Sequence, residues 1–130
     1  MFVDTSAVYA LLDGDDANHH RAEQGWTHLL SGKQKMITSN YVTIELCALL
    51  QRRLGLKAVR DLQEVVQPVV ALHWIEETIH LAGVSAVLAS GKKGLSLVDC
   101  TSFEIMRRLG IREAFTFDRH FRDQGFACLP

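Results

Sequence analysis

The feature that most constrains the fold is a repeated alternation of short β-rich runs with longer amphipathic stretches. The β-rich runs, which we predict to be strands, are Phe2–Asp4, Lys35–Thr38, Val69–His73, Ala114–Phe117 and Phe126–Leu129. The predicted helices are Ala7–Leu12, Ala17–Leu30, Tyr41–Leu54, Leu56–Val66, Ile75–Ala89 and Leu97–Leu109. This alternation is typical of an α/β domain, in which crossover helices connect parallel strands and cover both faces of the sheet.

Local signals mark several of these boundaries. Asn40 stands where the N-cap of the third helix belongs, and Gly110 follows the last predicted helix at the position of a C-terminal cap. Pro68 separates a helical pattern from the strand after it, while Gly91 and Gly94 mark a loop.

Length and composition favour one compact domain, residues 1–130. The chain has 130 residues, 48% of them hydrophobic, and no Pro/Gly-rich linker. No apolar run approaches the roughly 20 residues of a membrane-spanning helix, and the first residues lack a secretory pattern, so we expect a cytoplasmic protein with no membrane partner. Cys47, Cys100 and Cys128 form no C-x-x-C pair. The net charge of −1 means that any nucleic-acid surface must be local.

The predicted topology brings four acidic residues to one edge of the sheet. Asp4 and Asp118 end the first and fourth strands, and ligands of parallel α/β sheets bind beyond the C-terminal ends of the strands. Glu45 lies in a helix that begins at this edge, about 7 Å beyond Asn40 at ~1.5 Å per residue. Asp99 is in the first turn of a helix that starts at the same edge.

Glu45 carries a second signal. Its neighbours three and four residues away are Tyr41, Val42, Ala48 and Leu49, which predicts that its carboxylate points into packed apolar surface. Such a carboxylate is costly unless it is paired or bound to a cation. Two carboxylates ~5 Å apart repel by roughly 3 kcal/mol at an effective dielectric near 20. All-oxygen ligands suit Mg²⁺ or Mn²⁺ far better than zinc, so we predict a metal site of Asp4, Glu45, Asp99 and Asp118.

Three of the four acids also have ordinary structural explanations. Asp4 can cap the helix that follows it, Asp99 resembles a capping box with Ser96, and Asp118 can open a turn with Arg119 and His120. Neither a cap nor a solvated face explains Glu45. The metal site rests on the convergence of all four.

These residues resemble the signature of the PIN-domain family over the whole chain. Phe2-Val3-Asp4-Thr5-Ser6-Ala7 resembles the first strand of the family with its acidic end, and Thr38-Ser39 followed by Glu45-Leu46 resembles the second acidic position. Leu97-Val98-Asp99-Cys100 and Thr116-Phe117-Asp118-Arg119-His120-Phe121 resemble the third and fourth. A secondary pattern of the family is similar to Asp16-Ala17-Asn18-His19 followed by Ala22.

The resemblance implies a PIN-like three-layer α/β/α sandwich with a five-stranded parallel sheet of order 3-2-1-4-5. It also implies Mg²⁺- or Mn²⁺-dependent cleavage of RNA. A single short PIN domain resembles the toxin of a VapBC-type toxin–antitoxin pair, which implies a homodimer and a small antitoxin protein as partner.

We expect Asp4 and Asp99 to hold the principal metal, with Asp118 and Glu45 completing a second or water-mediated shell. Metal-activated water would attack the phosphate in line and leave a 5′-phosphate and a 3′-hydroxyl. Hydroxyls and cations near the acids are candidates for binding ligands or phosphate: Thr5, Ser6, Thr116, Arg119, His120, Arg122, Lys92 and Lys93. Arg52, Arg53, Arg107 and Arg108 lie farther along their helices, where we expect ordinary solvated faces.

Three alternatives stay open. The first is a different metal-dependent nuclease that acts on DNA or on a structured flap. The second is a free-standing PIN nuclease outside a toxin–antitoxin pair. The third is a non-catalytic PIN module that binds RNA or a protein, although four converging carboxylates have no evident purpose in such a module.

Overall fold

The centre of the molecule is a parallel sheet of five short strands. The computed structural model describes residues 1–91 and 94–130. Its strands are β1 (Phe2–Val3), β2 (Ile37–Ser39), β3 (Ala71–His73), β4 (Glu113–Phe115) and β5 (Ala127–Leu129). They are arranged in the order β3-β2-β1-β4-β5, and every neighbouring pair is parallel. The predicted fold class and strand order are therefore confirmed.

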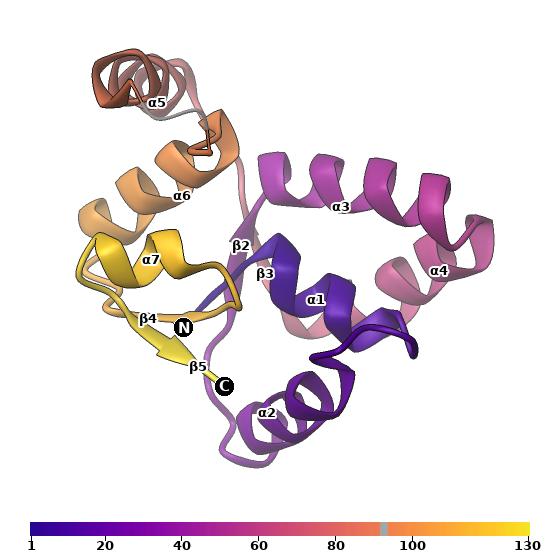
Figure 1. The fold of residues 1–130 in the computed structure, drawn as a ribbon. Coiled ribbons are helices and arrows are strands. Elements are labelled where there is room, and N and C mark those ends of the chain that lie inside the picture. Colours follow the sequence, from indigo (N-terminus) through magenta and orange to yellow (C-terminus); the bar gives the residue numbers. More distant parts are fainter. Residues whose placement is uncertain (92–93) are drawn as a thin grey trace.

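Helices flank this sheet (Figure 1). They are α1 (Thr5–Leu12), α2 (His19–Ser31), α3 (Asn40–Arg53), α4 (Leu56–Asp61), α5 (Glu77–Ser90), α6 (Leu97–Arg108) and α7 (Arg119–Asp123). In the view of Figure 1, β2 and β3 lie between α6 and α7 on the left and α3 and α4 on the right, and β4 and β5 lie below α7. Of the described helices, none is long and apolar enough to cross a membrane.

Several local predictions need correction. Ser39, not Asn40, caps α3, because its Oγ accepts a hydrogen bond from the Val42 amide at 3.2 Å. The Asn40 side chain instead accepts from the Ile75 amide at 2.8 Å and so fixes the chain that follows β3. The helix predicted over Leu56–Val66 changes after Asp61 into a wider π-helical turn, Leu62–Val66. Pro68 lies inside a short 3-10 turn, Gln67–Val69, rather than between elements.

Helix α7 was not predicted, and it matters for the site because Asp118 is its N-cap. Its anchor is Phe121, which is fully buried and meets the Phe103 ring edge-on at 4.9 Å between centroids. The Phe2 ring of β1 stacks on the Phe121 ring, with 6.2 Å between their centroids. This aromatic cluster fixes the end of β4 and the start of α7 against the strand that carries Asp4.

Candidate active site

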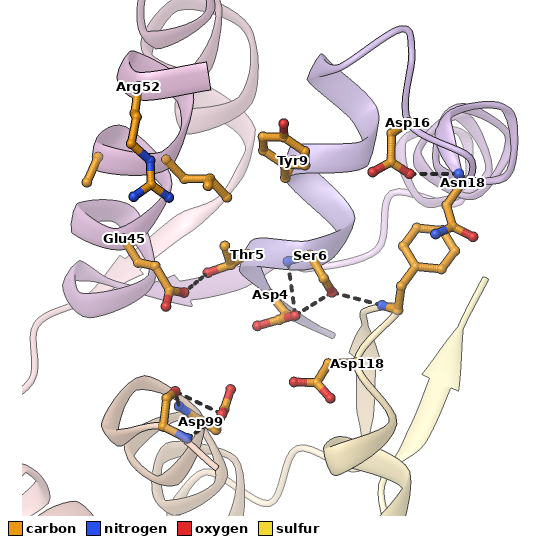
Figure 2. Close-up of a pocket in the computed structure, with 14 residues that line it drawn as sticks. Asp4, Thr5, Ser6, Tyr9, Asp16, Asn18, Glu45, Arg52, Asp99 and Asp118 are labelled. Atoms are coloured by element: carbon orange, nitrogen blue, oxygen red, sulfur yellow. Dashed lines mark hydrogen bonds between the residues drawn. The ribbon is translucent and has the colours of Figure 1, made fainter. Parts of the chain in front are cut away.

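One cavity at the C-terminal edge of the sheet collects all four predicted acids. It has a volume of about 750 Å³, and Asp4, Glu45, Asp99 and Asp118 line it together with Thr5 and Ser6. Figure 2 shows the four carboxylates arriving from four separate elements: the end of β1, α3, α6 and the turn before α7. The topological argument for a common edge is therefore correct at the level of residue placement.

Asp4 is the most buried of the four, with 4% of its surface exposed. Its Oδ2 accepts from the Ser6 amide at 3.1 Å, the Ser6 hydroxyl at 2.6 Å and the Thr116 hydroxyl at 2.8 Å. Burial raises the pKa of Asp4 to about 6, although these hydrogen bonds act to lower it and the charge of Asp99 adds to the rise. A metal ion beside Asp4 would favour its ionised form.

Asp99 and Asp118 are both held by helix-start hydrogen bonds. Asp99 forms a capping box with Ser96, whose amide and hydroxyl each donate to Asp99 Oδ2 at 2.8 Å. Asp118 Oδ1 accepts from the His120 amide at 2.9 Å. The ordinary structural explanations for Asp4, Asp99 and Asp118 are thus correct, and each residue also lines the cavity.

Glu45 is placed differently from our expectation. The buried face of α3 is formed by Val42, Leu46 and Leu50, whereas Glu45 is only partly buried. A wall of the cavity is instead formed by residues on one face of α3, spaced three, four and seven positions from Glu45: Glu45, Ala48, Leu49 and Arg52. The apolar neighbours of Glu45 therefore line an open site, and its carboxylate does not point into packed core.

Every one of the four carboxylates has one oxygen held and one oxygen without a hydrogen bond. Thr5 Oγ1 donates a hydrogen bond to Glu45 Oε2. Among the aspartates, the oxygens that accept hydrogen bonds are Asp4 Oδ2, Asp99 Oδ2 and Asp118 Oδ1. Within residues 1–91 and 94–130, the opposite oxygens accept no hydrogen bond: Asp4 Oδ1, Glu45 Oε1, Asp99 Oδ1 and Asp118 Oδ2. The side chains are fixed in position, and each keeps an acceptor for a cation.

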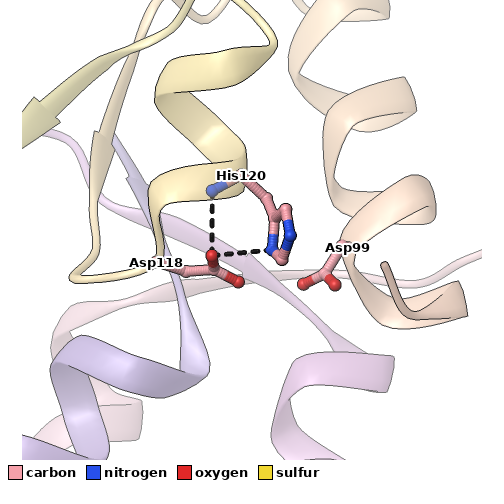
Figure 3. Close-up of side chains that lie close together, drawn as sticks. All are labelled: Asp99, Asp118 and His120. Carbon is pink, nitrogen blue, oxygen red and sulfur yellow. Dashed lines mark hydrogen bonds and ion pairs between the residues drawn. The ribbon is translucent and has the colours of Figure 1, made fainter. Parts of the chain in front are cut away.

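His120 joins this group from the first turn of α7. Ligand atoms of Asp99, Asp118 and His120 all lie within 4.8 Å of one another (Figure 3). His120 Nδ1 lies 2.8 Å from Asp118 Oδ1 in ion-pair contact, but this buried nitrogen makes no hydrogen bond with the described residues. A buried imidazole nitrogen that makes no hydrogen bond and lies beside two carboxylates is a candidate for a further metal ligand.

The hydroxyls that we expected near ligand or phosphate donate to carboxylates instead. Thr5 donates to Glu45, and both Ser6 and Thr116 donate to Asp4. Ser6 Oγ and Thr116 Oγ1 also accept from the amides of Phe117 and Asp118, both at 2.9 Å. Because each hydroxyl has a single proton, these residues orient the acids in this structure.

The predicted cations are less concentrated at the cavity than we expected. Arg119 and Arg122 are exposed on α7, and neither is among the described residues that line the cavity. Lys92 and Lys93 lie outside the described residues. Arg107 and Arg108 occupy the solvated face that we predicted, where Arg108 pairs with Glu104 at 2.7 Å.

Sequence reasoning missed five other cavity residues: Tyr9, Asp16, Asn18, Arg52 and Phe117. We expected Arg52 on an ordinary solvated face, but its side chain lines the cavity as well as facing solvent. Its spacing of seven residues from Glu45 was the available signal, since residues two helical turns apart share a face. Asp16 and Asn18 belong to the pattern Asp16-Ala17-Asn18-His19, for which the sequence alone indicates no role in the site.

Comparison with known proteins gives consistent matches over almost the whole chain. The model of the PIN domain family matches residues 1–127. A protein of Mycobacterium tuberculosis named 23S rRNA-specific endonuclease VapC20 is 33% identical over 127 residues, which cover 97% of this chain and 95% of that protein. A VapC ribonuclease of Aquifex aeolicus is 26% identical over 128 residues, covering 98% and 93% of the two chains.

Two solved structures also resemble this chain over almost their whole length. The crystal structure of the Mycobacterium tuberculosis VapC20, described as a sarcin–ricin loop cleaving toxin, has a TM-score of 0.87 at 32% identity and covers 97% of this chain and 95% of its own. FitAcB from Neisseria gonorrhoeae has a TM-score of 0.70 at 16% identity, with coverage of 99% and 96%. At that identity the second match shows a shared fold alone.

Proposed function

The chain belongs to the PIN-domain family, and we propose that it is an endoribonuclease that depends on Mg²⁺ or Mn²⁺. The observation that carries this proposal is the set of four positioned carboxylates that keep one free oxygen each beside a common cavity. Hard oxygen ligands of this kind are those that Mg²⁺ and Mn²⁺ prefer. The names of the relatives, an endonuclease and a ribonuclease, support the same class of reaction.

Asp99 and Asp118 are the residues best placed to hold the metal directly, with the buried Nδ1 of His120 beside them. The proposed metal set is completed by the free oxygens of Asp4, which follows β1, and of Glu45 in α3. A divalent ion in this site supplies a polarised water and compensates charge on the phosphate.

The protein's own residues prepare the site for that chemistry. Ser6 and Thr116 hold the Asp4 carboxylate in one orientation, and Thr5 does the same for Glu45. Ser96 fixes Asp99 through two hydrogen bonds of 2.8 Å. Because these side chains are positioned before substrate arrives, little reorganisation is needed when charge develops on the phosphate. The expected products carry a 5′-phosphate and a 3′-hydroxyl.

We further propose that the nuclease is the toxin of a VapBC-type pair. This rests on the relative described as a cleaving toxin and on the relatives' VapC names. A small antitoxin protein is then the expected partner. Purified antitoxin from the neighbouring gene should form a stable complex with the chain and inhibit RNA cleavage. If the neighbouring genes encode no protein that binds it, a free-standing nuclease becomes the better assignment.

The test of the proposed reaction is cleavage of matched single-stranded RNA and DNA with Mg²⁺, with Mn²⁺ and with a chelator. A stem-loop of the sarcin–ricin sequence belongs among the RNAs, because a 33% identical relative is a 23S rRNA endonuclease. We expect metal-dependent cleavage of RNA that Asp4→Asn and Asp99→Asn abolish. Asp123→Asn is the matched control, since Asp123 is exposed at the end of α7. Preferential cleavage of DNA, or full activity of the two site variants, would contradict the proposal.

A further inference from the structure

The far end of the cavity, away from Asp99 and Asp118, has its own chemistry. Tyr9 of α1 and Arg52 of α3 line it. Figure 2 shows the Arg52 guanidinium extending from α3 on the Glu45 side, with the Tyr9 ring on the neighbouring α1. This end adjoins the proposed metal site but holds none of the four acids that we assign to the metal.

Arg52 is an unpaired cation beside a strongly acidic surface. Five carboxylates line the cavity: Asp4, Asp16, Glu45, Asp99 and Asp118. Among the described residues, the Arg52 side chain makes no hydrogen bond or ion pair. Its helix position is two turns beyond Glu45, about 10.5 Å along the axis at 1.5 Å per residue. The guanidinium lines the same cavity as the acids but is paired with none of them among the described residues, so it is free to accept an anion from outside.

Tyr9 adds an aromatic surface to the same end of the cavity. The neighbouring Asp13 raises the pKa of the Tyr9 phenol. The ring itself is one helical turn from Thr5 and is only partly buried. An arginine that holds a phosphate beside an aromatic ring that stacks on a base is a common way to bind single-stranded nucleic acid.

We propose that Arg52 and Tyr9 form a binding subsite for a nucleotide that flanks the scissile bond of an unpaired RNA strand. Arg52 contacts a phosphate other than the one that is cleaved, and the Tyr9 ring stacks on the adjoining base. This inference rests on the proposed function for the identity of the ligand. It also explains how RNA approaches a cavity with five carboxylates. Arg52 attracts the strand to one wall, and a divalent ion held by the four acids would offset their charge at the other end.

The test measures RNA binding rather than cleavage. A fluorescein-labelled, unstructured RNA 12-mer is titrated with protein carrying Asp99→Asn, and its anisotropy is followed at several salt concentrations. Adding Arg52→Ala should raise Kd by at least about tenfold, and the slope of log K against log salt should fall by about 0.7. Arg112→Ala is the matched control, because Arg112 is exposed and lines a hollow at the opposite edge of the sheet. Equal RNA binding by the Arg52 and Arg112 variants would overturn the phosphate contact.

Variants of Tyr9 test the stacking half of the proposal. Tyr9→Phe keeps the ring and should bind RNA as the parent does, whereas Tyr9→Leu should weaken binding by about fivefold or more. Equal binding by the two variants, with melting temperatures that match the parent, would overturn the stack. Weaker binding by Tyr9→Phe than by Tyr9→Leu would do the same.

Two further readouts separate this inference from the proposed function. Calorimetric Mn²⁺ binding without RNA should be at least as tight in Arg52→Ala as in the otherwise unmodified protein, because the variant removes a repulsive cation. A loss of Mn²⁺ affinity would point to a structural role of Arg52 and overturn the subsite.

Cleavage assays give the second readout. If the unmodified chain binds RNA through Arg52 but cleaves no RNA with any metal, the nuclease proposal fails and the subsite stands. If the unmodified chain cleaves RNA and Arg52→Ala leaves KM unchanged, the subsite fails and the nuclease proposal stands.

Discussion

At the scale of single residues, Asp4 combines burial with three hydrogen-bond donors on one oxygen. Its pKa rises from 3.8 to about 6, so the folded protein binds this proton more tightly than the unfolded chain does. The stability that comes from the protonated carboxyl is therefore complete below about pH 4 and is lost as the pH rises through 6. In the absence of metal, the ionised Asp4 destabilises the fold at neutral pH.

Asp4→Asn should remove this penalty. The amide oxygen of asparagine can accept the same donors, so at pH 7 without metal the variant should gain up to about 3 kcal/mol of unfolding free energy. Near pH 3.5 the variant and the parent should be equally stable. Urea unfolding with a chelator at both pH values measures the difference, with Asp123→Asn as control. An Asp4→Asn effect that is the same at pH 3.5 and pH 7 would show that ionisation of Asp4 is not its cause.

At the scale of elements, α5 packs closely on α6, the helix that carries Asp99. Gly83 of α5 is buried against α6, and a Cβ built on it would lie 2.5 Å from Thr101 Cγ2. Since α6 begins with the turn that carries Asp99, the closeness of this contact helps to set where that carboxylate stands.

Gly83→Val should therefore destabilise the protein by about 1–3 kcal/mol through overpacking. Ser85→Val, at an exposed position of the same helix, is the control for the helix propensity of valine and should cost under about 1 kcal/mol. Urea unfolding reports both values. Equal losses in the two variants would mean that α5 and α6 have room between them and that the contact does not restrain α6.

The elements also show what the sequence allowed us to predict. The long helices have clear periodicity, and the five strands could be found as short β-rich runs between them. The strand order was predicted from the resemblance to the PIN-domain family, and the structure confirms it. Helix α7 has only five residues, too few for a periodic pattern, although Asp118 at its start and Gly125 just beyond its end are typical cap residues. For α3, periodicity identified the shared face of Glu45 and Leu49 but not whether that face was core or cavity. That distinction depends on tertiary packing, as does the placement of His120 Nδ1 beside Asp99 and Asp118.

At the scale of the whole molecule, α5 has more apolar surface than the fold covers. The helix is largely apolar around its circumference, yet only Ile79 and Gly83 are buried. Leu81 and Leu88 are 55% and 77% exposed. Helix α3 adjoins it through a hydrogen bond of 2.8 Å between Tyr41 and His80, and Ile44 of α3 is also exposed. A helix with this much exposed apolar surface is normally covered by a partner, which supports the expectation of a homodimer.

Leu88→Glu should then convert a dimer into a monomer, because the substitution buries a charge on each side of a two-fold interface. Light scattering after gel filtration should show about half the parent mass. Leu56→Glu is the matched control, since Leu56 is similarly exposed on α4 and should leave the mass unchanged. A parent protein that is already monomeric at high concentration would remove the basis for a dimer.

The account as a whole depends on the four carboxylates forming one metal site, and Mn²⁺ binding tests this most directly. Calorimetry should show that the wild-type protein binds Mn²⁺ and that Asp118→Asn weakens binding by at least about tenfold. Asp123→Asn should bind Mn²⁺ as the wild type does. No detectable Mn²⁺ binding by the wild type, or equal affinities of the Asp118 and Asp123 variants, would contradict the metal site and the proposed nuclease mechanism with it.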